Sequence, residues 1–103
     1  MTGTHQLFIA KIVTASDWKK FKIQFETEHP FFYSQLHKKH PDLSPAELRL
    51  VTLIKLRYNI GKISEVLCVD PKSIIKLRYR LKKKLKLEEN FGLEEWVESI
   101  EEK

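Results

Sequence analysis

Residues 70–85 read DPKSIIKLRYRLKKKL and, together with Lys86, carry eight positive charges and no acid after Asp70. Asp70 is a good helix N-cap, and Pro71 suits the first helical position because its fixed φ is already helical. This stretch therefore predicts a basic helix over about Pro71 to Lys86.

The predicted helix has two different faces, because successive side chains turn by about 100°. Its core face would hold Ile74, Leu77, Leu81 and Leu85, and its opposite face would hold Lys72, Lys76, Tyr79 and Lys83. Like charges three or four residues apart on a helix repel by roughly 0.2–0.5 kcal/mol per pair. A helix that tolerates this repulsion indicates a polyanionic partner. DNA, whose neutralised phosphates release condensed counterions, is the commonest one.

Length and composition limit the classes of protein to which this chain can belong. The 103 residues, 42% of them apolar, are enough for one domain with its own core. The net charge is +5, but seven of the fourteen acids follow Leu87, so the end of the chain is acidic. The lone Cys68 excludes an internal disulfide and favours a reducing, cytoplasmic location. The apolar run Leu7 to Val13 is far shorter than the ~20 residues of a membrane span, so no membrane partner is expected.

Helix start signals divide this single domain, residues 1–103, into three parts. We expect an N-terminal segment (1–13), accessory helices (15–40), and a helix-turn-helix core with a C-terminal helix (44–103). The first helix should begin after Thr14, and Pro30 should open the second. Ser44 to Glu47 reads S-P-A-E, a capping box with proline at the first helical position, and predicts a central helix to about Arg57.

The middle of the chain predicts a helix-turn-helix. A short helix from Ile60 to Leu67, a three-residue turn over 68–70 and the basic helix follow one another. A last helix is expected from Leu93 to about Ile100, with Trp96 and Val97 on its apolar side. That side would either close the core of one molecule or form a two-fold dimer contact. Every segment reads as helix, so the predicted class is all-α.

In a helix-turn-helix, the position of a residue predicts its role. The second helix enters the major groove, and the rest of the unit contacts the sugar-phosphate backbone of the DNA. The predicted base contacts are Lys72, Ile75, Lys76 and Tyr79, and the predicted phosphate contacts are Lys62, Ser73, Arg80, Lys82, Lys83 and Lys86. Lys76 would donate to guanine, and the exposed Ile75 would pack on a thymine methyl group. Arg78 projects close to the core face and is expected to pair with an acid.

Other chemistries find little support in the sequence. His37 and His40 lie one turn apart, but no further ligand pattern completes a four-coordinate metal site. No nucleophile elbow or glycine-rich phosphate loop is present. We therefore expect no enzyme activity, no cofactor and no metal.

A family resemblance covers most of the chain, from about Val13 to Ile100. It is carried by TASDW (14–18), PDLSPAELRL (41–50) and RYRLKKKL (78–85), together with Phe25, His29, Pro30, Phe32 and Leu36. These residues resemble the C-terminal helix-turn-helix output domain of Bacteroidetes-type transcriptional regulators, within the wider LuxR/GerE-type class. The resemblance implies a tetrahelical DNA-binding core preceded by additional N-terminal helices. It also implies a homodimer on two half-sites and an upstream sensor or coiled-coil region in a signal-responsive, or two-component, regulator.

The chain departs from that family pattern around the short helix and its turn. Gly61 lies inside the helix and lowers its stability by about 1 kcal/mol relative to alanine. Lys62 replaces the glutamate that would complete a capping box. Cys68 occupies the turn position often filled by Gly or Asn. A left-handed conformation there would be strained by about 1 kcal/mol.

Three rival functions remain open. The first is a protein-interaction module whose basic helix docks on an acidic protein partner. The second is a basic amphipathic helix on an anionic membrane, disfavoured because its apolar face has no aromatic anchor. The third is RNA binding, disfavoured because exposed stacking aromatic residues are scarce near the lysines.

Overall fold

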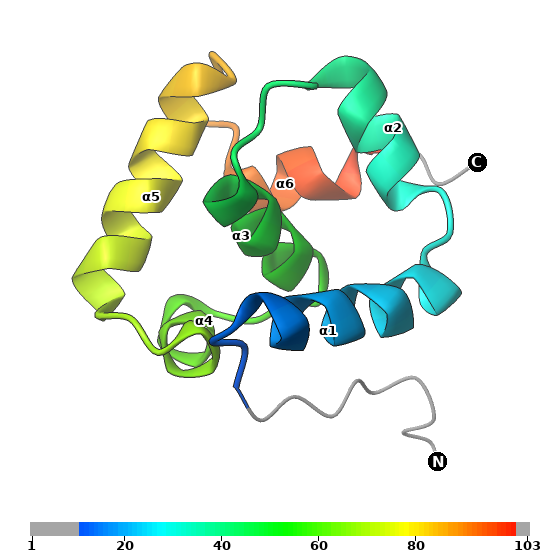
Figure 1. The fold of residues 1–103 in the computed structure, drawn as a ribbon. Coiled ribbons are helices and arrows are strands. Elements are labelled where there is room, and N and C mark those ends of the chain that lie inside the picture. Colours follow the sequence, from blue (N-terminus) through cyan, green and yellow to red (C-terminus); the bar gives the residue numbers. More distant parts are fainter. Residues whose placement is uncertain (1–10, 101–103) are drawn as a thin grey trace.

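The computed structural model describes residues 11–100, and within this range the chain is all-helical, as the sequence predicts. Six helices follow one another: α1 (Ala15–Glu28), α2 (Phe32–Lys39), α3 (Pro45–Lys55), α4 (Ile60–Leu67), α5 (Pro71–Lys84) and α6 (Leu93–Glu98). Figure 1 shows α3 in the centre, with α5 and α2 on opposite sides of it and α1 running across one end. The helix α5 therefore forms one outer edge of the domain.

The start of α1, predicted after Thr14, is fixed by a reciprocal capping box. The Thr14 hydroxyl accepts from the Asp17 N–H, and the Asp17 carboxylate accepts from the Thr14 N–H, both at 3.0 Å. The hydrogen bonds from the Thr14 and Val13 N–H groups lower the pKa of Asp17 below its ordinary value. From this fixed start, α1 turns Phe21 and Phe25 into the core.

The helix α2 begins at Phe32, two residues later than the sequence predicts. Phe31 is its N-cap residue, and the Phe32 N–H bonds back to the His29 carbonyl at 3.3 Å. Pro30 thus forms the corner between α1 and α2 instead of the first turn of α2. The corner lets the ring of Phe32 meet the ring of Phe25 edge to face, with centroids 5.5 Å apart.

The helix α3 is the centre of the core. Its N-cap Ser44 and Glu47 form the predicted reciprocal capping box. All five residues from 50 to 54 are buried, and four of them are apolar, namely Leu50, Val51, Leu53 and Ile54. The helix ends at Lys55 and not at Arg57, because Leu56 caps it and Arg57 has a left-handed φ of 67°.

The short helix α4 and its turn have the predicted bounds. Asn59 caps α4 by accepting from the Lys62 N–H at 2.8 Å. Cys68 then adopts the left-handed conformation (φ 57°, ψ 45°), which reverses the chain within three residues. Asp70 caps α5, accepting from the Lys72 N–H at 2.8 Å.

The ends of α5 and α6 differ slightly from the prediction. The helix α5 ends at Lys84, two residues early, and Lys86 has a left-handed φ of 57°. The helix α6 ends at Glu98, and Ile100 lies beyond it. The apolar side of this last segment is buried within the single chain, at Leu93, Trp96, Val97 and Ile100. Of the two predicted roles for this side, the structure places it in the core of one molecule.

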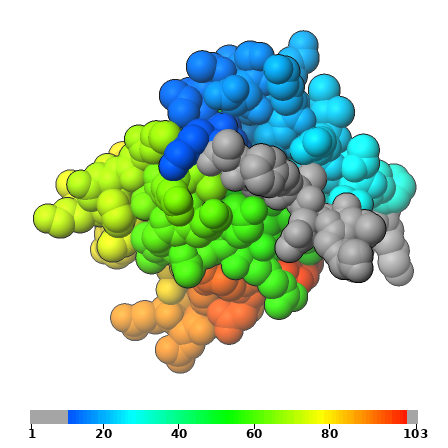
Figure 2. All heavy atoms as spheres, turned by 90° about the horizontal axis from the view of Figure 1, so that it is seen from below, coloured from blue at the N-terminus to red at the C-terminus, as the bar shows by residue number. Residues whose placement is uncertain are grey.

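The N-terminal segment predicted over 1–13 is described only from Lys11 onward. Ile12 is buried, and its N–H donates to the Val66 carbonyl on α4 at 2.7 Å. Figure 2 shows this blue start of the described chain lying against the lime-coloured region of α4. The described residues do not include 1–10 or 101–103, so most of the apolar run Leu7 to Val13 lies outside them.

Between residues 11 and 100, none of the helices has the length and apolar character needed to cross a bilayer.

The left-handed turn at Cys68 yields a stability prediction. We expect Cys68→Gly to be at least as stable as the natural chain, because glycine adopts this conformation without strain. We expect Cys68→Val to be less stable by about 1 kcal/mol, because a β-branched side chain is strained there. Urea unfolding followed by circular dichroism measures both free energies. Equal stability of the two variants would contradict a left-handed residue in the turn.

Candidate nucleic-acid interface

The helix α5 is held by its aliphatic side. Ile74 and Leu81 are buried, and Leu77 and Leu85 pack half-buried against the same core. Burying one such side chain contributes about 1.5–3 kcal/mol. This exceeds the roughly 0.2–0.5 kcal/mol by which each like-charged pair opposes the helix. The core face therefore fixes which way the lysines point.

Two ion pairs fasten α5 to its neighbours. Arg78 bonds Glu94 on α6 at 2.9 Å, which confirms the expectation that it pairs with an acid. Near the other end, the Lys84 ammonium donates to the Glu47 carboxylate at 2.9 Å and to the Asp42 carbonyl at 2.8 Å. Lys84 is thus a structural cation, and it ties the end of α5 to the start of α3.

Burial opposes the charge on Glu47, but the hydrogen bonds from the Ser44 N–H and the Lys84 ammonium outweigh it, so the pKa of Glu47 is lowered. The same hydrogen bond raises the pKa of Lys84 above its ordinary value. Both groups are therefore charged at neutral pH, and the pair is intact there.

The predicted base-contact residues lie together on the outer side of α5. Lys72, Ile75, Lys76 and Tyr79 are all exposed there, with Ile75 52% and Tyr79 61% accessible to solvent. A shallow hollow is lined by Ile75, Lys76, Tyr79 and Arg80. The Lys83 ammonium lies 5.1 Å from the centre of the Tyr79 ring, which holds the ring beside the lysines.

The predicted phosphate-contact residues are more scattered. Arg80 and Lys83 are exposed on α5, Ser73 is exposed in its first turn, and Lys86 follows its end. Lys62 lies on α4, where it forms an exposed ion pair with Glu65 at 4.0 Å. Lys82 is half-buried and donates to the Glu89 carbonyl at 3.1 Å, so it is partly occupied within the chain.

The outer cations have no acidic partner within residues 11–100. Neither an ion pair nor a side-chain hydrogen bond to an acid forms there at Lys72, Lys76, Arg80, Lys83 or Lys86. Two of the C-terminal acids are engaged elsewhere: Glu94 holds Arg78, and Glu98 lies within 4 Å of both Lys55 and Arg57. The described part of the acidic segment therefore leaves the lysine side of α5 open.

Arg49, to which no sequence pattern gives a role, lies on α3 beside the side of α5 that carries Ile74, Leu77 and Arg80. Its guanidinium carbon is 5.5 Å from the centre of the Trp18 ring, and its buried Nε has no hydrogen-bond partner. A single cation within the apolar run Leu48 to Ile54 is the signal that identifies it in retrospect.

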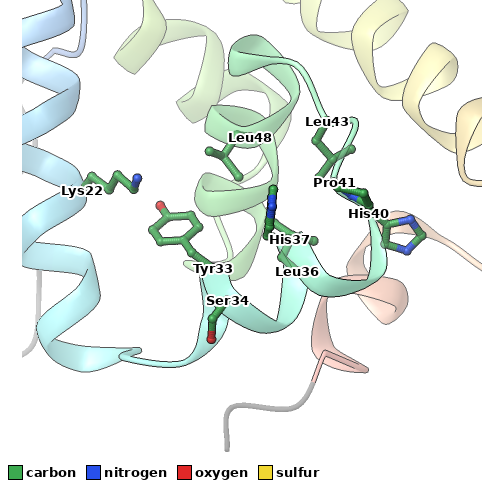
Figure 3. A pocket seen from close by; sticks show the side chains of 9 residues that line it. All are labelled: Lys22, Tyr33, Ser34, Leu36, His37, His40, Pro41, Leu43 and Leu48. Atoms are coloured by element: carbon green, nitrogen blue, oxygen red, sulfur yellow. The ribbon is translucent and has the colours of Figure 1, made fainter.

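A second concave region lies between α1, α2 and the loop that follows α2 (Figure 3). His37 and His40 both line it, but Figure 3 shows their rings lying apart. The His40 ring meets the Trp96 ring on α6 edge to face, with centroids 5.3 Å apart. Across residues 11–100, no group of three or more metal-ligating side chains gathers.

No known protein family, curated protein or solved structure matches this chain. What can be said of its function comes from the arrangement of its own residues.

The ion pair between Glu47 and Lys84 predicts a specific dependence of stability on pH. Because the pKa of Glu47 is lowered in the folded state, its stabilising contribution is complete above its unfolded value of 4.5. That contribution is lost as the pH falls through the lower folded value. Lys84 acts in the opposite sense: its contribution is complete below 10.5 and is lost as the pH rises through its higher folded value.

We therefore expect Glu47→Gln to flatten the fall in unfolding free energy as the pH drops below about 4.5, measured by urea titration at each pH from about 6 to 3. The matched control is Glu28→Gln, an exposed change at the end of α1 that should keep the natural slope. A Glu47→Gln variant with the natural slope would show that the pair does not stabilise the domain.

Proposed function

We propose that this chain is a sequence-specific double-stranded DNA-binding domain, either a transcriptional regulator or its output domain, acting in the cytoplasm. The observation that carries the proposal is the set of exposed cations on α5 with no acidic partner within residues 11–100. Phosphate neutralisation would relieve their mutual repulsion and release counterions from the DNA.

The arrangement of α4, its turn and α5 supports a helix-turn-helix assignment. A short helix precedes a three-residue turn, and a longer basic helix follows, as in proteins that place the second helix in the major groove. The 14 residues of α5 span about 21 Å at 1.5 Å per residue, enough to lie along a groove about 12 Å wide. In this proposal α3 to α6 form the LuxR/GerE-like tetrahelical core, and α1 and α2 are accessory helices.

The exposed side chains then divide by role. Lys72, Lys76, Tyr79 and Ile75 face base edges, and Arg80, Lys83 and Lys86, with Lys62 and Ser73, hold phosphates. Lys82 contributes to phosphate binding only after leaving the Glu89 carbonyl. Homodimerisation on two half-sites and an upstream sensor or coiled-coil region belong to the same proposal. The apolar side of α6 is not available for that dimer, because it is buried within the chain.

Selection of binding sites from random duplexes, followed by affinity measurements at several salt concentrations, tests the proposed function directly. We expect one preferred sequence and an affinity that falls steeply with salt. The absence of any duplex binding at low salt would overturn the proposal.

Two lysines on the same side of α5 should give different effects. Lys76→Ala should weaken the preferred site by about 1–3 kcal/mol and relax specificity at one position, because Lys76 is assigned to a base. Lys83→Ala should weaken preferred and random DNA alike and lower the salt slope by about one. Fluorescence anisotropy with both duplexes measures the affinities. Equal losses on both DNAs for both variants would contradict the assigned roles.

The hollow beside Ile75 predicts recognition of a thymine methyl group. Replacing one thymine of the preferred site by uracil removes that methyl group and should cost about 1 kcal/mol. Ile75→Ala should cost a similar amount on the thymine site and little more on the uracil site, because the two changes remove the same contact. If the loss caused by Ile75→Ala and the loss caused by uracil add in full at every thymine that is tested, Ile75 contacts no thymine methyl group.

A further inference from the structure

A groove of about 420 Å³ lies on the inner flank of α5, beside the outer side proposed for DNA. Its floor is apolar and is formed by residues of three segments, Ile12, Leu67, Ile74 and Leu77. Val13 and Val69 stand at its rim, 59% and 42% exposed. Single exposed apolar side chains are normal, but two that border one apolar groove extend it into a larger patch.

Two guanidinium groups line the same groove. Arg49 reaches it from α3 and Arg80 from α5. Neither makes an ion pair within residues 11–100, and the Arg49 Nε is buried without a hydrogen-bond partner. With no acid paired to either guanidinium within these residues, a carboxylate brought to the groove would meet a cation that it can bind by parallel hydrogen bonds.

We propose that this groove is a docking site for an acidic segment of another protein, one that carries a carboxylate next to a bulky apolar side chain. The apolar side chain would fill the floor between α3 and α5. The carboxylate would bind the guanidinium of Arg49 or Arg80, the side chain best shaped for that group. The site differs from the lysine side of α5, because its floor is apolar and its two cations flank it.

The chain's own N-terminal residues do not suit this groove. Residues 1–10 contain no Asp or Glu, so they offer no carboxylate to either arginine. A second copy of the chain suits it no better. A two-fold contact would set the same patch against itself and bring arginines together with no acid among the residues that line the groove.

The shape of the patch also favours a protein segment over a small molecule. A compound confined to the groove would leave the exposed rim, Val13 and Val69, in water. A peptide that passes over the groove covers both. DNA phosphate would satisfy the arginines, but it has nothing to place on the apolar floor, and it would leave that surface hydrated.

The test begins with a display library of random peptides, about 12 residues long, selected on the immobilised protein. The selected peptides are then synthesised with a fluorophore, and their binding is measured by anisotropy. We expect sequences in which Asp or Glu neighbours Leu, Ile or Phe. Neutral or basic sequences, or no enrichment at all, would overturn the proposal.

Variants then locate the bound peptide. Val69→Ser should weaken binding at least about ten-fold, because it removes part of the rim, and so should Arg49→Met or Arg80→Met, whichever removes the cation that holds the carboxylate. The matched controls are Lys38→Met on α2 and Ile23→Ser on α1, which are exposed and lie outside the groove, and binding should be unchanged. Equal binding to the natural chain, to Arg49→Met and to Arg80→Met would refute the site.

Two further measurements keep the result independent of folding and of DNA. Replacing the acid of the selected peptide by its amide should weaken binding to the unaltered protein by a similar factor, which needs no variant to fold. Arg49→Met should keep the natural affinity for the preferred duplex, since Arg49 has no role in the proposed DNA contact. A loss of DNA affinity in this variant would show that Arg49 serves the DNA and not a protein segment.

Discussion

The burial of the aliphatic side of α5 is the interaction on which the arrangement of this molecule depends. The helix carries a run of cations that repel one another, and it stays folded because Ile74 and Leu81 are removed from water against the core. Two buried side chains supply about 3–6 kcal/mol, whereas each like-charged pair opposes the helix by only a few tenths, roughly 0.2–0.5 kcal/mol. Packing therefore decides the orientation of α5. The exposed charge is a consequence of that orientation and does not cause it.

The acids of the chain are placed so that they reinforce this orientation. Glu47 on α3 and Glu94 on α6 pair with two cations of α5, Lys84 and Arg78. Glu98 lies near Lys55 and Arg57, away from the outer side of α5. A net charge of +5 thus becomes a local concentration of positive charge on one side of one helix. Such a concentration steers a polyanion far more effectively than the same charge spread evenly over the surface.

Local signals in the sequence predicted most helix starts, because caps depend on neighbouring residues alone. Thr14, Ser44, Asn59 and Asp70 each cap the expected helix through a side-chain oxygen. Helix ends were predicted less well, because the chain leaves α3 and α5 through left-handed residues, Arg57 and Lys86, that carry no glycine or asparagine signal. Pro30 was misassigned because proline suits a corner as well as a first helical turn.

For the candidate interface, the helical period was enough to separate the exposed lysines from the buried aliphatic residues. It could not show that Lys84 and Lys82 turn back to Asp42, Glu47 and Glu89, because those contacts join residues distant in sequence or in an irregular loop. The groove beside Arg49 could not be predicted from the sequence for the same reason. It is built from Ile12, α3 and α5, and only the tertiary fold brings these segments together.

Arg80 connects the two surfaces, because it lines both the hollow beside Ile75 and the groove beside Arg49. One guanidinium cannot bind a phosphate and a carboxylate at full strength at the same time. A segment docked through Arg80 would therefore weaken DNA binding, and by reciprocity DNA would weaken the docking by the same factor. A segment docked through Arg49 alone would leave Arg80 to the DNA, and both partners would bind together. The position of the carboxylate within the groove thus decides whether a protein partner opposes DNA binding or accompanies it.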